Sequence, residues 1–85
     1  MKVLHILRDL EEALPLEVAR AHQDAGHKVT LLLLHDAVLR QLDFPGQVLA
    51  CRDDLLARGV EAKYPALDYP EMVQLIFQHD RVISW

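Results

Sequence analysis

The sequence is poor in the residues that several common chemistries require. Its three glycines stand apart at Gly26, Gly46 and Gly59, so neither a glycine-rich phosphate loop nor a dinucleotide-binding fingerprint is present. The single serine, Ser84, has no nucleophile-elbow sequence around it. The single cysteine, Cys51, excludes an intramolecular disulfide. These shortages argue against nucleotide binding through a phosphate loop, serine hydrolysis and a disulfide scaffold.

Long runs of one residue kind are also missing. The nine basic residues are scattered over a chain of net charge −4, so we expect neither direct nucleic-acid binding nor a polybasic membrane anchor. The longest apolar run, around Leu31–Leu34, is far too short to span a membrane. Charged residues from Lys2 onward do not suit a signal peptide. We therefore expect a cytoplasmic protein with no membrane contact.

Hydrophobic residues, in contrast, are plentiful. They make up 52% of the 85 residues, which is generous for one domain over residues 1–85. A domain of this size buries only a little over half of its unfolded surface. We expect the surplus to be buried in a well-covered α/β fold and between subunits.

The hydrophobic pattern alternates between strand and helix signals. We predict strands at Val3–Leu7, Val29–Leu34, Val48–Ala50, Val60–Leu67 and Arg81–Trp85, and helices at Ala13–Ala25, Ala37–Leu42, Asp53–Arg58 and from Asp68 onward. Val29–Leu34 lacks alternation, as expected of a strand covered on both faces. This order predicts an α/β fold, a single three-layer α/β/α domain with a mainly parallel five-stranded sheet.

Local signals support these boundaries. Pro15 is suited to the first turn of a helix, while Gly26 and Gly59 suit the ends of two helices. In the first helix, the spacing of four residues predicts one apolar face (Leu14, Val18, Ala21 and Ala25), with Leu16 and Ala19 beside it. Pro65 weakens the fourth strand, since proline is a poor member of a strand ladder.

Cys51 is the sharpest candidate for chemistry. It lies between a predicted strand end and a helix N-terminus, where the helix dipole and Arg52 favour the thiolate, while Asp53 and Asp54 oppose it. The alternative is a small buried hydrophobic residue, because free cysteines are among the most buried residue types. Position alone leaves both interpretations open.

Two residues at the end of the second strand could assist. His35 and Asp36 could supply or relay a proton, or Asp36 could cap the following helix with His35 solvated. His5 lies within a strand and is expected to be a hydrogen-bonded interior residue. No histidine has metal-ligand spacing with another ligand, so we expect neither a metal nor an organic cofactor.

Several segments resemble the DsrH/TusB family over nearly the whole chain. The similar segments are Val3–Leu7, Leu31–Val38, Asp53–Val60, Tyr69–Ile76 and the terminal Trp85. The resemblance implies the fold of the DsrE/DsrF/DsrH superfamily, which assembles into oligomers. It also implies relay of sulfane sulfur as a cysteine persulfide, toward tRNA 2-thiouridine or within sulfur oxidation.

The resemblance leaves two roles for Cys51. DsrH/TusB members often lack the acceptor cysteine and support a homologous subunit, whereas DsrE/TusD members carry it before a helix that ends in Arg-Gly. Cys51 stands in that place relative to Arg58 and Gly59. The first hypothesis is a sulfur carrier with Cys51 as acceptor, assisted by His35, Asp36 and Arg52, with sulfur donor and acceptor proteins as partners.

The second hypothesis is a structural subunit that stabilises a homologous partner, with Cys51 used in packing only. A third, a small-ligand-binding module, is the least favoured because a phosphate loop is missing. Alanine at Ala37, where the family pattern has glycine, weakens the transfer of roles to His35 and Asp36.

Overall fold

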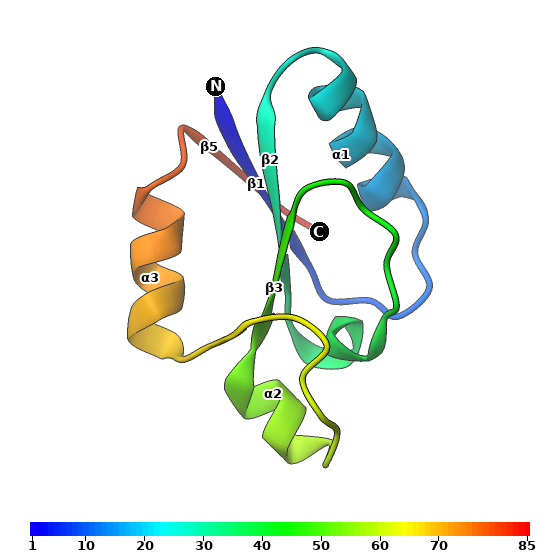
Figure 1. The fold of residues 1–85 in the computed structure, drawn as a ribbon, viewed down its shortest axis with the longest axis vertical. Helices are drawn as coiled ribbons and strands as arrows, with labels where there is room; N and C mark the ends of the chain where they lie inside the picture. Colours follow the sequence, from blue (N-terminus) through cyan, green and yellow to red (C-terminus); the bar gives the residue numbers. More distant parts are fainter.

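A computed structural model of the protein describes residues 1–85 and has five parallel strands in one sheet, in the order β4-β3-β2-β1-β5 (Figure 1). The elements are β1 (Lys2–Leu7), α1 (Leu14–Asp24), β2 (Lys28–Leu33), the 3₁₀ helix η1 (His35–Leu39), β3 (Gln47–Cys51), α2 (Arg52–Ala57), β4 (Ala66–Leu67), α3 (Tyr69–Phe77) and β5 (Arg81–Ser84). The predicted α/β class, element order and five-stranded sheet are confirmed, and the sheet is parallel throughout.

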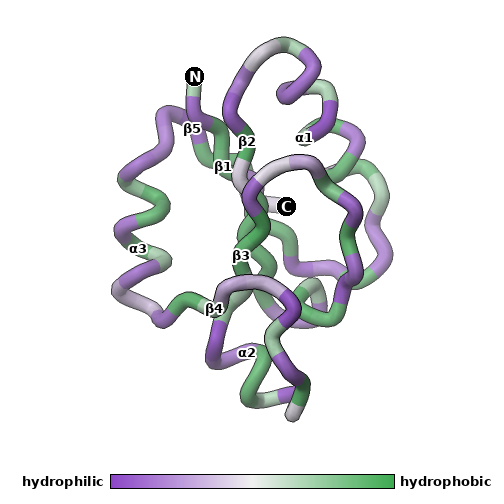
Figure 2. Tube along the Cα trace, in the orientation of Figure 1, coloured by the Kyte–Doolittle hydropathy of each residue, from purple (hydrophilic) through white to green (hydrophobic).

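The central strands are hydrophobic because both of their faces are covered. β1 and β2 pair from Lys2 and Lys28 to Leu7 and Leu33, and only the first residue of each is exposed. Figure 2 shows hydrophobic residues along these strands, while the helices and loops around them carry both hydrophobic and hydrophilic residues. The unbroken apolar run that predicted a doubly covered strand is therefore explained.

The two faces carry unequal cover. One face packs against α1, η1 and α2 in a cluster of eleven buried residues. The other packs against α3 alone, in a cluster of five that joins Leu75 to residues of three strands (Leu4, Ile6, Leu32 and Leu49). The result is the predicted three-layer arrangement, with α3 on the opposite side of the sheet from α1 (Figure 1).

Helix ends follow the predicted signals. Gly26 and Gly59 adopt positive φ angles of 93° and 62°, which glycine accepts without strain. α3 begins with a capping box in which the Asp68 carboxylate accepts from the Glu71 N–H and the Glu71 carboxylate accepts from the Asp68 N–H. Such a cap is worth about 1 kcal/mol.

Two local predictions were wrong. β4 contains only Ala66–Leu67 instead of Val60–Leu67, because the proline at position 65 has no N–H and only its carbonyl pairs, accepting from Ala50. In α1 the predicted face of Leu14, Val18, Ala21 and Ala25 is not the buried one. Ala19 and Leu16, which were predicted to lie beside that face, are in or against the core, together with the buried Pro15.

A polar side chain that points inward explains why the buried face of α1 differs from the predicted one. His22 lies on the inward side of the helix, and its Nδ1 is 3.0 Å from Nε2 of His5, which is fully buried in β1. The indole N–H of Trp85 donates to Nδ1 of His5 at 3.0 Å. Because an indole nitrogen can only donate, neutral His5 carries its proton on Nε2 and donates it to His22. The prediction that His5 is a hydrogen-bonded interior residue is confirmed.

Burial, and secondly the nearby His22, lower the pKa of His5 from 6.5 to about 4. At pH values between about 4 and 6.5, His5 binds a proton in the unfolded chain but not in the folded chain. We expect the free energy of unfolding contributed by His5 to be fully present above pH 6.5 and to decrease by up to about 3 kcal/mol as the pH falls toward 4.

Urea unfolding at a series of pH values measures this loss. His27→Gln, which alters a histidine outside the His5 hydrogen bonds, is expected to keep the wild-type pH dependence. His5→Phe removes the titrating ring and is expected to reduce the dependence. A wild-type protein equally stable across this pH window would contradict the assignment.

Candidate functional site

Cys51 lies where parallel-sheet proteins commonly place their sites, at the carboxyl edge of the sheet. It is the last residue of β3 and the N-cap of α2, as the sequence predicted. Its side chain is nevertheless buried, with 6% of the residue exposed, and it is a free cysteine. None of the four cavities of the structure is lined by Cys51. Most of the Cys51 side chain is therefore covered in this conformation.

The local electrostatics favour the neutral thiol. Burial raises the pKa of Cys51 above its usual value, and the Asp54 carboxylate beside it acts in the same direction. The backbone N–H groups of Asp54 and Asp53 oppose this shift but do not overcome it. The Cys51 side chain makes no capping hydrogen bond to α2, a helix of only six residues. The nucleophilic thiolate is thus disfavoured.

Asp54 joins the predicted site residues to one another. Its Oδ2 accepts the backbone N–H of His35 at 2.8 Å, which ties the end of β2 to α2. Burial alone would raise the pKa of Asp54, but the His35 N–H, the Cys51 thiol and the Arg58 guanidinium hold it below its usual value. Asp54 is therefore a carboxylate at neutral pH, with its charge beside the Cys51 sulfur.

His35 and Asp36 are both near this carboxylate but have different partners. His35 is the only residue other than glycine with a positive φ, 52°, a conformation that costs a side-chain-bearing residue of order 1 kcal/mol. Its imidazole is not among the hydrogen-bonded groups of the site. Asp36 accepts from Nε and Nη2 of Arg58 at 3.1 and 3.0 Å and does not cap η1, whose N-cap is Leu34.

Arg58 completes the cluster, and Arg52 lies away from it. Nη1 of Arg58 is 3.6 Å from Oδ1 of Asp54, an (i, i+4) ion pair within α2 and its C-cap. The guanidinium of Arg52 instead donates to the carbonyl of Ala66 in β4 at 3.2 Å. The structure thus brings Cys51, His35 and Asp36 to one edge of the sheet. Arg52 stabilises that edge through its hydrogen bond to β4.

The linking role of Asp54 and Arg58 was not predicted from the sequence. Their spacing of four residues marks an ion pair on one helix face, which is the one signal available. The contact of Asp54 with the His35 N–H depends on the angle at which α2 meets the sheet, and no sequence pattern gives that angle.

The remaining polar residues after β1 serve the fold. Oδ1 of Asp9 accepts the N–H groups of Glu11 and Glu12, forming the turn before α1. Arg8 donates to the carbonyl of Trp85 at 3.1 Å. No group of three or more His, Cys, Asp or Glu side chains is arranged to hold a metal ion.

A scan of the chain against models of protein families gives no match, and a search of curated protein sequences gives none either. The structure contains no helix with the length and hydrophobicity that crossing a membrane requires. The fold and the site therefore define an α/β domain with a buried cysteine at the carboxyl edge of its sheet.

Replacing the carboxylate beside the sulfur tests this electrostatic assignment. Asp54→Asn removes the charge but keeps an amide oxygen that can accept the His35 N–H. We expect the pKa of Cys51 to fall, because a negative charge no longer opposes the thiolate. The ultraviolet absorbance of the thiolate across a pH titration measures the shift.

Asp53→Asn is the matched control, since Asp53 affects Cys51 only through its backbone N–H. The control is expected to leave the pKa of Cys51 unchanged. Equal shifts in the two variants, or none in Asp54→Asn, would show that the Asp54 charge does not act on the thiol.

Proposed function

We propose that the chain takes part in cytoplasmic sulfur relay as a supporting subunit, which stabilises a homologous partner that carries the reactive cysteine. The resemblance to DsrH/TusB sequences supports the pathway. The observation that favours the supporting role is the Cys51 thiol, which is buried and has a raised pKa. A sulfur acceptor requires an accessible thiolate.

The segments that resemble the family form parts of the sheet and of the helices that cover it. The strand containing His5 and the terminal Trp85 are joined by the indole hydrogen bond to His5. Asp53–Val60 forms α2 with its C-terminal turn, and Tyr69–Ile76 forms most of α3. These segments stabilise the sheet and its cover, which fits a protein whose contribution is structural.

The outer surface of α3 supports association with another subunit. Tyr69 and Phe77 are 71% and 84% exposed, and Ile76 is 37% exposed. Val82 of β5, on the same face of the sheet as α3, is also exposed. Exposed aromatic and aliphatic side chains of this size on a small domain are typical of interaction surfaces.

The second candidate is a carrier in which Cys51 itself accepts sulfur. The position of Cys51 at the start of α2, with two backbone N–H groups favouring its thiolate, supports this role. Its deprotonated sulfur would attack the terminal sulfur of a donor persulfide, forming the Cys51 persulfide and releasing the donor thiolate. This step requires the sulfur to become more exposed than it is in this conformation.

Thiol reactivity separates the two roles. We expect native Cys51 to react with iodoacetamide roughly a hundredfold more slowly than the urea-unfolded chain, because both burial and protonation protect it. We also expect the intact mass of the reduced protein to remain unchanged after incubation with a persulfide donor. Mass spectrometry measures both reactions.

Cys51→Ser supplies the control for background modification. A gain of one sulfur atom by the wild type alone, reversed by reductant, would establish the carrier role and exclude the supporting role. Slow alkylation with no gain of sulfur agrees with the supporting subunit.

Association through α3 is tested separately. We expect the 9.7-kDa chain to sediment as a species larger than a monomer at high concentration, and Phe77→Glu to reduce this association by placing a charge on the apolar surface. Gln74→Glu, an exposed position on the same helix, is the matched control. A monomer at every concentration would contradict self-association through this surface.

A further inference from the structure

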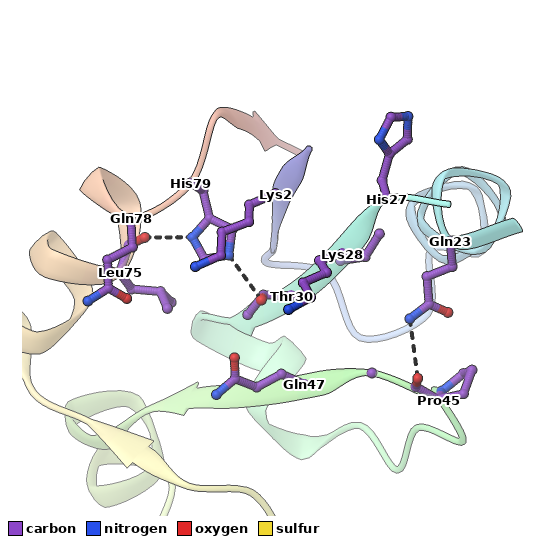
Figure 3. A pocket seen from close by; sticks show the side chains of 12 residues that line it. Lys2, Gln23, His27, Lys28, Thr30, Pro45, Gln47, Leu75, Gln78 and His79 are labelled. Carbon is purple, nitrogen blue, oxygen red and sulfur yellow. Dashed lines mark hydrogen bonds between the residues drawn. The ribbon is translucent and has the colours of Figure 1, made fainter. Parts of the chain in front are cut away.

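We propose a second site, a groove at the amino edge of the sheet that binds a small phosphate-bearing molecule. The groove has a volume of about 480 Å³ and lies between the first residues of three strands and the end of α3 (Figure 3). Small-molecule sites commonly have volumes of about 300 to 1,000 Å³. The groove is at the opposite end of the strands from Cys51, so the proposal is independent of the sulfur-relay role.

Positive charge is concentrated in this groove without a partner. Lys2 and Lys28 are direct neighbours on paired strands, so both side chains are on the same face of the sheet. The only two ion pairs in the chain both involve Arg58, so neither lysine has a carboxylate within 4 Å. Like charges directly opposite one another destabilise a strand pair. An anion between the two lysines would reverse this repulsion.

The wall of the groove supplies fixed and free polar groups. His79 is held by hydrogen bonds of 2.7 Å to the Leu75 carbonyl and 3.0 Å to the Thr30 hydroxyl. The carbonyl can only accept, so Nδ1 of His79 carries a proton. Gln47 forms no hydrogen bond to the other groove residues (Figure 3). Its amide and the two ammonium groups are available to a ligand.

The lining also limits the class of ligand. Only two of its twelve residues are hydrophobic, so the groove offers no continuous apolar surface for an acyl chain. No arginine lines it, so an anion would be held by the two lysines, which bind phosphate as point charges and not through a planar fork. The Asp80 carboxylate accepts the Lys2 backbone N–H at 2.8 Å and is an opposing charge beside the groove.

A titration followed by NMR tests the site. Inorganic phosphate and glucose 6-phosphate are added separately to the wild-type protein at constant ionic strength, with sodium chloride as reference. We expect saturable amide shifts at Lys2, Lys28, Thr30, Gln47 and His79. Tighter binding of glucose 6-phosphate would identify an ester site, and equal binding would identify a site for the phosphate group itself.

Charge removal provides the decisive comparison. The Lys2→Gln/Lys28→Gln double variant is expected to weaken binding at least about tenfold, because two charge-assisted hydrogen bonds are lost. Lys63→Gln removes a lysine outside the groove and is expected to bind as the wild type does. Both altered groove positions are exposed at strand starts, and the variant spectrum reports whether the fold is kept.

Three results would overturn the proposal. They are shifts that grow linearly without saturation, shifts centred away from the groove, and equal affinity in the double variant and Lys63→Gln. The wild-type shift map is informative by itself even if the double variant does not fold. A failure here would leave the supporting role untouched, since that role depends on Cys51 and α3.

Discussion

The structure depends on covering both faces of a parallel sheet with a chain of 85 residues. Parallel strands bury both faces, so each face needs helices. One face has α1, η1 and α2, but the other has only the nine residues of α3. Leu75 is the one buried residue of this helix and belongs to the core cluster of that face, while Ile76 and Phe77 remain exposed. Unequal cover accounts for both the packed core and the exposed apolar surface.

The sequence predicts the arrangement of elements better than their faces. Strand and helix order follows from the alternating pattern, and Gly26 and Gly59 end helices because both need a positive φ. The buried face of α1 is predicted only in part, because His22, a polar residue, points inward and hydrogen-bonds His5. The fourth strand is shorter than its hydrophobic run because the chain pairs only after Pro65.

For the candidate site too, the sequence predicts where a residue lies in the fold better than what surrounds it. That Cys51 lies at the carboxyl edge follows from counting residues along the third strand. That its thiol is buried, and that Asp54 links it to His35, depends on how α2 packs over the edge. The amino-edge groove has no sequence signal, since Lys2 and Lys28 are 26 positions apart and become neighbours only through the register of β1 and β2.

The pairing of β1 with β5 sets the order in which the domain can assemble during synthesis. β1 acquires β2 as its first neighbour early, but its other edge pairs with residues 81–84. The ring of His5 likewise receives its hydrogen bond from position 85. Contacts between such distant positions form late, because the intervening loop must close first. A ribosome-bound chain in which these residues are not yet synthesised therefore has an unpaired edge on β1. Chaperones can bind such an edge, and it can also pair with other chains and aggregate.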